Sequence, residues 1–356
     1  MPLLPTSRRS FLKTAAAGSL AGGTILAAGI PADLRTPHKL NRLVLRASGT
    51  AGAYDEKAVD CPFVFLHRGR YYMTFVAFDG AGYQTGLASS ANLLDWKPEG
   101  LILGRDPNSE ITRYNAAMNW IVRENGIFSA GRLKQIRGRY LGVYHAYPKP
   151  GYEQGSAAIG LCWSHDLRKW ELDPPCLHPE DGAAWERGGL YKPCLVEENG
   201  VFYLFYNAKT ADQRWHEQTG VAISHDLRTW KRHAGNPILR NGAAGSPDQW
   251  FASDPCVLQY GGQWAMFYFG LDGKGVARDL VALSPDLLKT EKCDGVLVDV
   301  GTAGSVDEKY AHKPSMIYRH GVLYHFYCAV AKDDTRGISV ATSKPVGGTV
   351  VIGPRP

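Results

Sequence analysis

The sequence lacks the patterns that mark several common functional classes. Its seven cysteines form no Cys-x-x-Cys pair, and no His/Cys cluster has the spacing of a zinc site. The Gly-x-Ser-x-Gly elbow of serine hydrolases is absent, and so are the glycine motifs of dinucleotide-binding and phosphate-binding loops. The formal charge is +6, but no basic block stands out. We therefore expect no nucleic-acid partner.

The N-terminal segment, as far as Ala32, has the features of an export signal. Arg8 and Arg9 precede Phe11-Leu-Lys13, and a mildly apolar Ala/Gly-rich run follows to about Ile30. This resembles a twin-arginine signal, with cleavage expected near Ala28 or Ala32. No later run is long and apolar enough to span a bilayer. We expect a periplasmic or secreted protein with no membrane segment in its mature form.

The cysteines are expected to stay unpaired. Twin-arginine cargo folds in the reducing cytosol before export, which argues against a disulfide framework. Cys194 and Cys256 each follow the proline of a predicted strand and are expected to be small buried side chains.

A glycine followed by an aromatic strand recurs five times, and this repeat predicts the fold. The five glycines are Gly69, Gly138, Gly200, Gly262 and Gly321. Their spacing is about 60–70 residues, and a period of this length, with about four strands in each unit, is typical of a β-propeller. The sequence therefore predicts an all-β, five-bladed β-propeller over residues 55–356, preceded by the signal (1–32) and an irregular lead-in (33–54).

A second repeated phrase, Ser-x-Asp-Leu-x-x-Trp, is expected to be structural. It occurs at Ser164–Trp170 and Ser224–Trp230, and an Asn version occurs at Ser90–Trp96. An Asp or Asn at the third position can close a turn by accepting bonds from its own backbone. We therefore do not expect Asp166 or Asp226 to be catalytic.

A proline seven residues before the glycine marks the innermost strand of four blades, at Pro62, Pro193, Pro255 and Pro314. Innermost strands converge on the propeller axis, so the residues before these prolines should surround one funnel. Blade by blade, these residues are Asp60 and Cys61, Ser129 and Ala130 (before Gly131), Tyr191 and Lys192, Ser253 and Asp254, and His312 and Lys313.

Each of these residues also has a structural explanation. Asp60 and Asp254 are of the kind that caps a turn before proline, and His312 of the kind that fills a core. Lys192 and Lys313 are equally suited to neutralising the acids and to binding substrate.

Further residues are expected to contribute to the same mouth. Glu217 and Glu153 lie near the start of a blade's third strand, and Glu186 precedes the inner strand of blade three. Tyr191, Trp250 and Tyr310 are candidates to stack on sugar rings. Cleavage of a glycosidic bond needs this kind of set, with one group to activate water or a nucleophile and an acid for the leaving oxygen.

The chain resembles the five-bladed glycoside hydrolases of families 43, 62, 32, 68, 117 and 130. The resemblance covers about residues 55–350 and rests on Val59-Asp-Cys-Pro62, on Ser253-Asp-Pro255 and on the repeated Ser-x-Asp-Leu-x-x-Trp phrase. It implies that Asp60 is the general base, as in family 43, and that Asp254 orients the sugar and raises the pKa of the acid. Family 43 also uses a Glu acid, and this sequence has no inner-strand match for it.

The similarity to family 117 implies His312 as the acid, with Glu217 or Glu186 as alternatives. Lys313 follows His312 where that family has Glu. The resemblance allows an axial calcium or other metal ion, although no local motif calls for one, and no other cofactor is expected.

The sequence thus predicts an exported glycosidase that removes terminal sugars from plant or algal oligosaccharides, with inversion implied by the family. The inner lysines raise a second hypothesis, that the sugar is anionic. Two alternatives stay open. One is a glycoside phosphorylase with phosphate held by Lys192, Lys313 or Arg187. The other is a propeller that binds carbohydrate without cleaving it.

Overall fold

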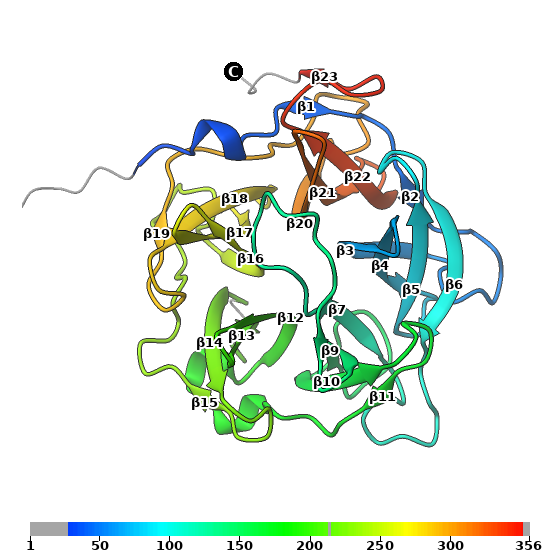
Figure 1. Cartoon of the computed structure of the whole chain (residues 1–356), viewed down its shortest axis with the longest axis vertical. Helices are drawn as coiled ribbons and strands as arrows, with labels where there is room; N and C mark the ends of the chain where they lie inside the picture. Colours follow the sequence, from blue (N-terminus) through cyan, green and yellow to red (C-terminus); the bar gives the residue numbers. More distant parts are fainter. Residues whose placement is uncertain (1–27, 213–214, 352–356) are drawn as a thin grey trace, which may run out of the picture.

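The computed structural model describes residues 28–212 and 215–351. These residues form β-strands and three short 3-10 turns, with no α-helix among them. Five antiparallel units surround one axis, with β3, β7, β12, β16 and β20 innermost (Figure 1). The predicted five-bladed β-propeller is confirmed. No helix in the described ranges is long and apolar enough to cross a membrane.

Each blade is a short meander, and its strands have these bounds. Blade one is β3 (Ala58–His67), β4 (Arg70–Phe78), β5 (Tyr83–Ser90) and β6 (Lys97–Leu103). Blade two is β7 (Ala117–Ile121), β8 (Gln135–Ile136), β9 (Arg139–Ala146), β10 (Ala158–Ser164) and β11 (Glu171–Leu172). Blade three is β12 (Gly189–Glu198), β13 (Val201–Lys209), β14 (Glu217–Ser224) and β15 (Lys231–Arg232). Blade four is β16 (Phe251–Tyr260), β17 (Gln263–Leu271), β18 (Ala277–Ser284) and β19 (Glu291–Lys292).

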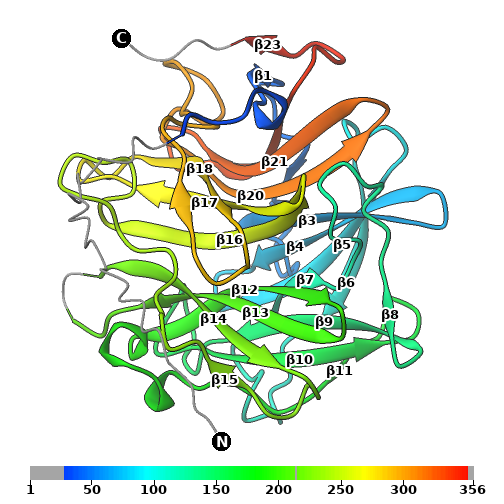
Figure 2. The same ribbon diagram turned by 60° about the vertical axis from the view of Figure 1, so that its left-hand side comes forward.

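Blade five combines strands from both ends of the chain. It contains β20 (Tyr310–Arg319), β21 (Val322–Val330) and β22 (Arg336–Thr342). The lead-in, predicted to be irregular, supplies β1 (His38–Lys39) and β2 (Leu45–Arg46), which both pair with β22. The last strand, β23 (Val350–Val351), pairs with β1 (Figure 2). The lead-in therefore closes the ring.

The five marker glycines each end a tight two-residue turn. The two turn residues have positive φ in all five hairpins: Arg68-Gly69, Arg137-Gly138, Asn199-Gly200, Gly261-Gly262 and His320-Gly321. Two left-handed residues in succession define the turn type that suits the twist of a hairpin, which explains the glycine at the second position. The repeat read from the sequence is therefore a repeat of turn geometry.

The Ser-x-Asp-Leu-x-x-Trp phrases form the predicted turns. The Asp166 carboxylate accepts bonds from the backbone N–H groups of Arg168 and Lys169 at 2.8 and 2.9 Å. Asp226 accepts from Arg228 and Thr229 in the same way. These acids serve the backbone, as expected.

Blade two departs from the prediction. Its inner strand is β7, which carries no proline, and the glycine marker follows the short strand β8 instead. The intervening segment, residues 122–134, crosses to other blades: Ile127 N–H donates to Gln259 O, and Arg123 donates to Val64 O and Met316 O. Ser129 and Ala130, predicted at the funnel, lie in this segment, near the ends of β3 and β16.

All seven cysteines are unpaired. Cys194 and Cys256 are buried in the main hydrophobic core, as predicted. That core runs between the blades and includes fully buried side chains such as Leu204, Phe205 and Met266.

Candidate active site

A bulge in each inner strand turns one side chain into the axis. In four blades the pairing register shifts at the residue before proline, and that residue has a positive φ: 48° at Cys61, 51° at Lys192, 55° at Asp254 and 69° at Lys313. A bulge re-aims a side chain at the cost of a strained backbone. In blade two the shift occurs around Asn119. Asn119 is therefore the true blade-two member of the predicted ring.

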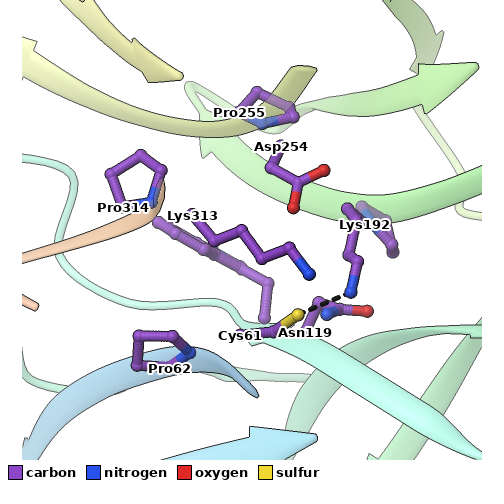
Figure 3. Close-up of a pocket in the computed structure, with 10 residues that line it drawn as sticks. Cys61, Pro62, Asn119, Lys192, Asp254, Pro255, Lys313 and Pro314 are labelled. Atoms are coloured by element: carbon purple, nitrogen blue, oxygen red, sulfur yellow. Dashed lines mark hydrogen bonds between the residues drawn. The ribbon is translucent and has the colours of Figure 1, made fainter. Parts of the chain in front are cut away.

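These five residues line a small axial cavity of about 30 Å³ (Figure 3). Figure 3 shows the Lys192 and Lys313 ammonium groups and the Asp254 carboxylate extending into one space, with Cys61 and Asn119 beside them. The prediction that residues far apart in sequence meet at the axis is correct for four blades and wrong for Ser129 and Ala130.

A wider cavity of about 200 Å³ is lined at its base by Lys192, Asp254 and Lys313. Its walls come largely from the loops between the second and third strands of the blades and from the first residues of inner strands. The other lining residues are Tyr152, Glu153, Tyr191, Trp215, Glu217, Phe251, Phe269, Leu271, Ala277, Tyr310, His312 and Arg336. We call this cavity the upper pocket. Aromatic walls with a few polar groups are typical of a small-molecule site.

Glu217 is fixed in the upper pocket by hydrogen bonds to both carboxylate oxygens. One oxygen accepts from the Tyr191 hydroxyl and from the Trp215 indole N–H, the latter at 2.7 Å. The other accepts from the Asn207 amide at 2.8 Å. The side chain is only 3% exposed. Burial, assisted by the charge of Glu153, raises the pKa of Glu217, the pattern of a carboxyl group that keeps its proton for use as an acid.

Asp254 lies beside Glu217 because the Asn207 amide nitrogen also donates to Asp254 Oδ1, at 3.1 Å. Asp254 Oδ2 is buried and has no partner. Burial raises the pKa of Asp254 to about 7, against the opposing charges of Lys192 and Lys313. Two carboxyl groups held by one amide tend to share a proton, since both cannot ionise freely.

Glu153 is the more accessible acid of the upper pocket. It lies in the loop between β9 and β10 and is partly exposed, and Tyr83 OH donates to it at 3.3 Å. The loop is held over the pocket mouth by two contacts: Gly151 N–H donates to Ala81 O, and Arg336 donates to Tyr152 OH at 3.0 Å.

Asp60, the predicted base, is 4% exposed and belongs to an ion cluster. Its Oδ2 accepts from Lys313 at 2.6 Å and from Arg336 at 3.4 Å, and its Oδ1 accepts from the Cys61 N–H. Burial opposes its ionisation, but Lys313, Lys192 and Arg336 outweigh burial and hold the pKa of Asp60 well below its usual value. Asp60 lines neither cavity. These contacts favour an electrostatic role behind the pocket, and its role as base stays a prediction.

His312, the predicted acid, does line the upper pocket. Its Nδ1 lies 3.1 Å from the Cys328 carbonyl oxygen, and its ring contacts Phe269 edge-on. Burial and the charge of Lys313 lower the pKa of His312 to about 3. The imidazole is therefore neutral at pH 7 and holds no readily released second proton, so Glu217 is the stronger candidate for the acid.

Three other predicted residues have different positions or roles. Glu186 lies outside both cavities, where it is buried, accepts from Tyr206 and forms an ion pair with Arg232. Trp250 also lines neither cavity, because it precedes β16 and only its neighbour Phe251 faces the pocket. Tyr191 is buried and holds Glu217 through its hydroxyl, so it presents little surface for stacking.

Sequence reasoning missed four contributors to this region: Asn119, Asn207, Tyr152 and Trp215. Trp215 is 38% exposed, lines the pocket and lies under the ammonium of Lys209 at 4.0 Å. The only sequence signal was its place two residues before Glu217. For Asn119 the signal was the interval from Gly69 to Gly138, which is longer than that between any other neighbouring marker glycines.

Comparison with known proteins agrees with this architecture. A solved structure described as a complex of BT0996 with RGII is 30% identical, covers 91% of this chain and 96% of its own, and superimposes with a TM-score of 0.77. The levanase of Bacillus subtilis (strain 168) is 28% identical over 152 residues, which are 40% of this chain and 20% of the levanase. The 1,2-beta-oligomannan phosphorylase of Thermoanaerobacter sp. (strain X514) is 25% identical over 157 residues, 43% of each protein.

This chain thus spans less than half the length of these two curated relatives. The family described as "Glycosyl hydrolases family 43" matches residues 149–354, which contain blades three to five and the Glu153 loop. Together with the propeller and its acid-lined pocket, this match identifies the chain as a member of glycosyl hydrolases family 43.

Proposed function

We propose that this glycoside hydrolase removes single, uncharged sugars from the ends of oligosaccharides, with Glu217 as the general acid. The observation that carries the proposal is the upper pocket, where Glu217, Glu153 and Asp254 meet in about 200 Å³. Pockets for drug-sized ligands start at about 300 Å³, so this one suits a single sugar ring. A small pocket of this kind favours attack at the end of an oligosaccharide.

The proposed chemistry assigns a role to each carboxyl group. Glu217, buried and with a raised pKa, gives its proton to the leaving oxygen. Glu153, partly exposed at the pocket mouth, is the partner that activates the water that attacks the sugar. Asp254, at the base of the pocket, is a second carboxyl group beside Glu217 and faces the sugar hydroxyls. This scheme replaces Asp60 and His312 in the predicted roles. Inversion, implied by the family resemblance, remains part of the proposal.

Charge balance in the pocket supports a neutral sugar. Lys313 and Arg336 both contact Asp60, which offsets part of their positive charge. Burial lowers the pKa of Lys209, against the opposing charges of Glu153 and Glu217, so this lysine is a weaker anchor for an anionic sugar than an exposed one. An anionic sugar would have to compete with these internal acids. Equal cleavage of a glycoside and its uronic-acid counterpart, or preference for the acid, would contradict this point.

The solved relative, described as a complex with RGII, makes RGII oligosaccharides the first substrates to test. The assay incubates the protein with these and with other plant and algal oligosaccharides, with and without phosphate, and measures free sugar. Phosphate-independent release that is abolished in Glu217→Gln supports hydrolysis.

Cleavage that requires added phosphate and yields a sugar phosphate would support the phosphorylase alternative. The similarity to the Thermoanaerobacter phosphorylase is the reason to test it. Arg187, one predicted phosphate ligand, is exposed and lines neither cavity. Binding without release by any variant would support a carbohydrate-binding propeller.

Export through the twin-arginine route is also part of the proposal. Most of the predicted signal, including Arg8 and Arg9, lies outside the described residues. Ile30 is buried against the propeller, and Gly29 bridges to blade four at Asp294. Cleavage after Ala28 keeps Gly29 and Ile30 but removes the Ala28 carbonyl that accepts from Asp294 N–H, whereas cleavage after Ala32 removes all of these contacts. Replacing both arginines with lysine is expected to leave the precursor in the cytosol, as cell fractionation would detect.

A further inference from the structure

The axial cavity has the wrong chemistry for the metal ion that the fold family allows. Calcium takes six to eight oxygen ligands. Of the ten residues that line this cavity, only Asp254 and Asn119 have side chains that carry oxygen, and two others, Lys192 and Lys313, end in ammonium groups. In the part of the chain that the structure describes, no group of three or more His, Cys, Asp or Glu side chains could hold a metal. The residues present therefore do not fit a divalent cation.

Lys192 is an unusual buried cation. It is 5% exposed, and its ammonium donates to the Cys61 sulfur at 2.5 Å. Among the described residues, no carboxylate forms an ion pair with it, whereas Lys313 contacts Asp60 at 2.6 Å. A buried charge without a partner is costly, so its retention needs a compensating group.

The compensating group in the same cavity is Asp254. Its Oδ2 is buried and has no hydrogen-bond partner. Nε2 of His145 has none either, and burial together with the charges of Lys192 and Lys313 lowers the pKa of His145. A cavity of about 30 Å³ exceeds the roughly 10–15 Å³ that one water needs. A water there can accept from Lys192 and donate to Asp254, which joins two groups that do not touch directly.

We propose that Lys192 is the built-in cation of the propeller axis, which takes the place of an axial metal ion and, through buried water, stabilises the carboxylate form of Asp254. Its effect on metal content and stability is independent of the proposed function. Its effect on catalysis rests on that function, because Asp254 forms the base of the sugar pocket. Lys192 is on this account a positioning residue that acts through Asp254.

The charges around Asp254 come from several elements and fix the sign of the expected change. The titratable groups that face it are Lys192 (β12), Lys313 (β20), Glu217 (β14), Glu153 (the β9–β10 loop), Asp279 (β18) and Cys61 (β3). Lys192 and Lys313 lower the pKa of Asp254, and the acids raise it. Since an opposite charge a few ångströms away lowers a carboxyl pKa by about 1–3 units, Lys192→Met should raise it by a similar amount.

The first experiment measures metal content and thermal unfolding of the mature protein without substrate. We expect no stoichiometric bound metal in the purified protein, and the same unfolding temperature with a chelator, with calcium and with neither. A tightly bound metal, or destabilisation by the chelator that calcium reverses, would overturn the proposal whether or not the protein is a hydrolase.

The second experiment compares Lys192→Met, Lys192→Arg and the exposed-surface control Lys289→Met. Asp254 has a pKa raised to about 7 in the fold, so its contribution to stability is complete below the pKa of the unfolded chain and is lost as pH rises through 7. Because the loss ends near pH 7 in the wild type, Lys192→Met should lose more unfolding temperature than the wild type between neutral and alkaline pH.

Lys192→Arg, which keeps the positive charge, and Lys289→Met should follow the wild-type pH dependence. In activity assays, the limb of the pH–rate profile that reflects ionisation of Asp254 should move to higher pH by about 1–3 units in Lys192→Met and in neither of the other two variants. A wild-type pH dependence of both stability and activity in Lys192→Met would overturn the proposal. If Lys192→Met does not fold, Lys192→Arg takes its place in the test. A pH dependence of Lys192→Arg that differs from that of the wild type would then overturn the proposal.

Discussion

Replacement of Glu217 by glutamine tests the assigned acid with little change in shape. The side chain keeps its length, and its carbonyl oxygen still accepts from Tyr191 and Trp215. The change affects mainly the bond from Asn207, because an amide NH2 group then faces another NH2 group. The loss of one neutral hydrogen bond costs about 1 kcal/mol, so the variant should remain folded.

The catalytic cost should be far larger than the structural cost. A positioned acid contributes about 10²–10⁴-fold, which corresponds to about 2.7–5.4 kcal/mol of barrier at about 1.36 kcal/mol per factor of ten. The loss should be greatest for natural linkages, whose leaving oxygen needs a proton. It should be smallest for aryl glycosides with acidic phenols, because those leave without one.

The assay measures kcat/KM on both kinds of substrate, beside the control Glu171→Gln. Glu171 is on the surface, where it pairs with Arg139, so its change should leave activity intact. The wild-type profile should fall as pH rises through the pKa of Glu217, which burial raises above its ordinary value. A folded Glu217→Gln protein within tenfold of wild type on natural linkages, with the same alkaline limb, would refute this assignment.

Three further substitutions separate structural from catalytic roles. Asp60→Asn leaves the buried Lys313 without its partner, so we expect a loss of about 3–5 kcal/mol in unfolding free energy by denaturant titration; a large loss of kcat at unchanged stability would instead support Asp60 as the base. The stabilisation from Asp60 is present above its unfolded-chain pKa and disappears as pH falls, because its pKa in the fold is depressed. Trp215→Phe keeps an aromatic face but removes the N–H that donates to Glu217. Because that N–H stabilises the carboxylate, its loss should move the alkaline limb of the kcat/KM profile to higher pH. An alkaline limb at the wild-type position would show that Trp215 does not influence the pKa of Glu217. Leu204→Ala, at a fully buried core position, should cost about 2–5 kcal/mol of stability and leave KM unchanged, and a stability equal to wild type would contradict the packing described.

The fold could be predicted because its repeat is local. Two successive left-handed residues end in glycine at each of the five marker hairpins, and an Asp or Asn two residues after serine closes the outer turn in blades one to four. Turn chemistry of this kind depends on neighbours in sequence, so it is visible without a structure. Blade two was misplaced because its inner strand has Asn119-Trp120 where the other blades have a residue followed by proline.

The site was only partly predictable, for a physical reason. Blade register correctly placed Asp254, Lys192 and Lys313 on the axis, since it depends on strand order. It could not reveal that Asp60 turns toward Lys313 instead of the pocket, nor that Tyr191 supports Glu217. Those facts depend on which way a side chain leaves a bulge.

The most direct test of the account is a crystal structure of Glu217→Gln with an oligosaccharide that the wild type cleaves. The terminal sugar should occupy the upper pocket against Trp215, with its glycosidic oxygen within hydrogen-bond distance of residue 217 and Glu153 beside the anomeric carbon. An oligosaccharide bound elsewhere on the propeller, or one whose glycosidic oxygen lies beyond the reach of residue 217, would contradict the account.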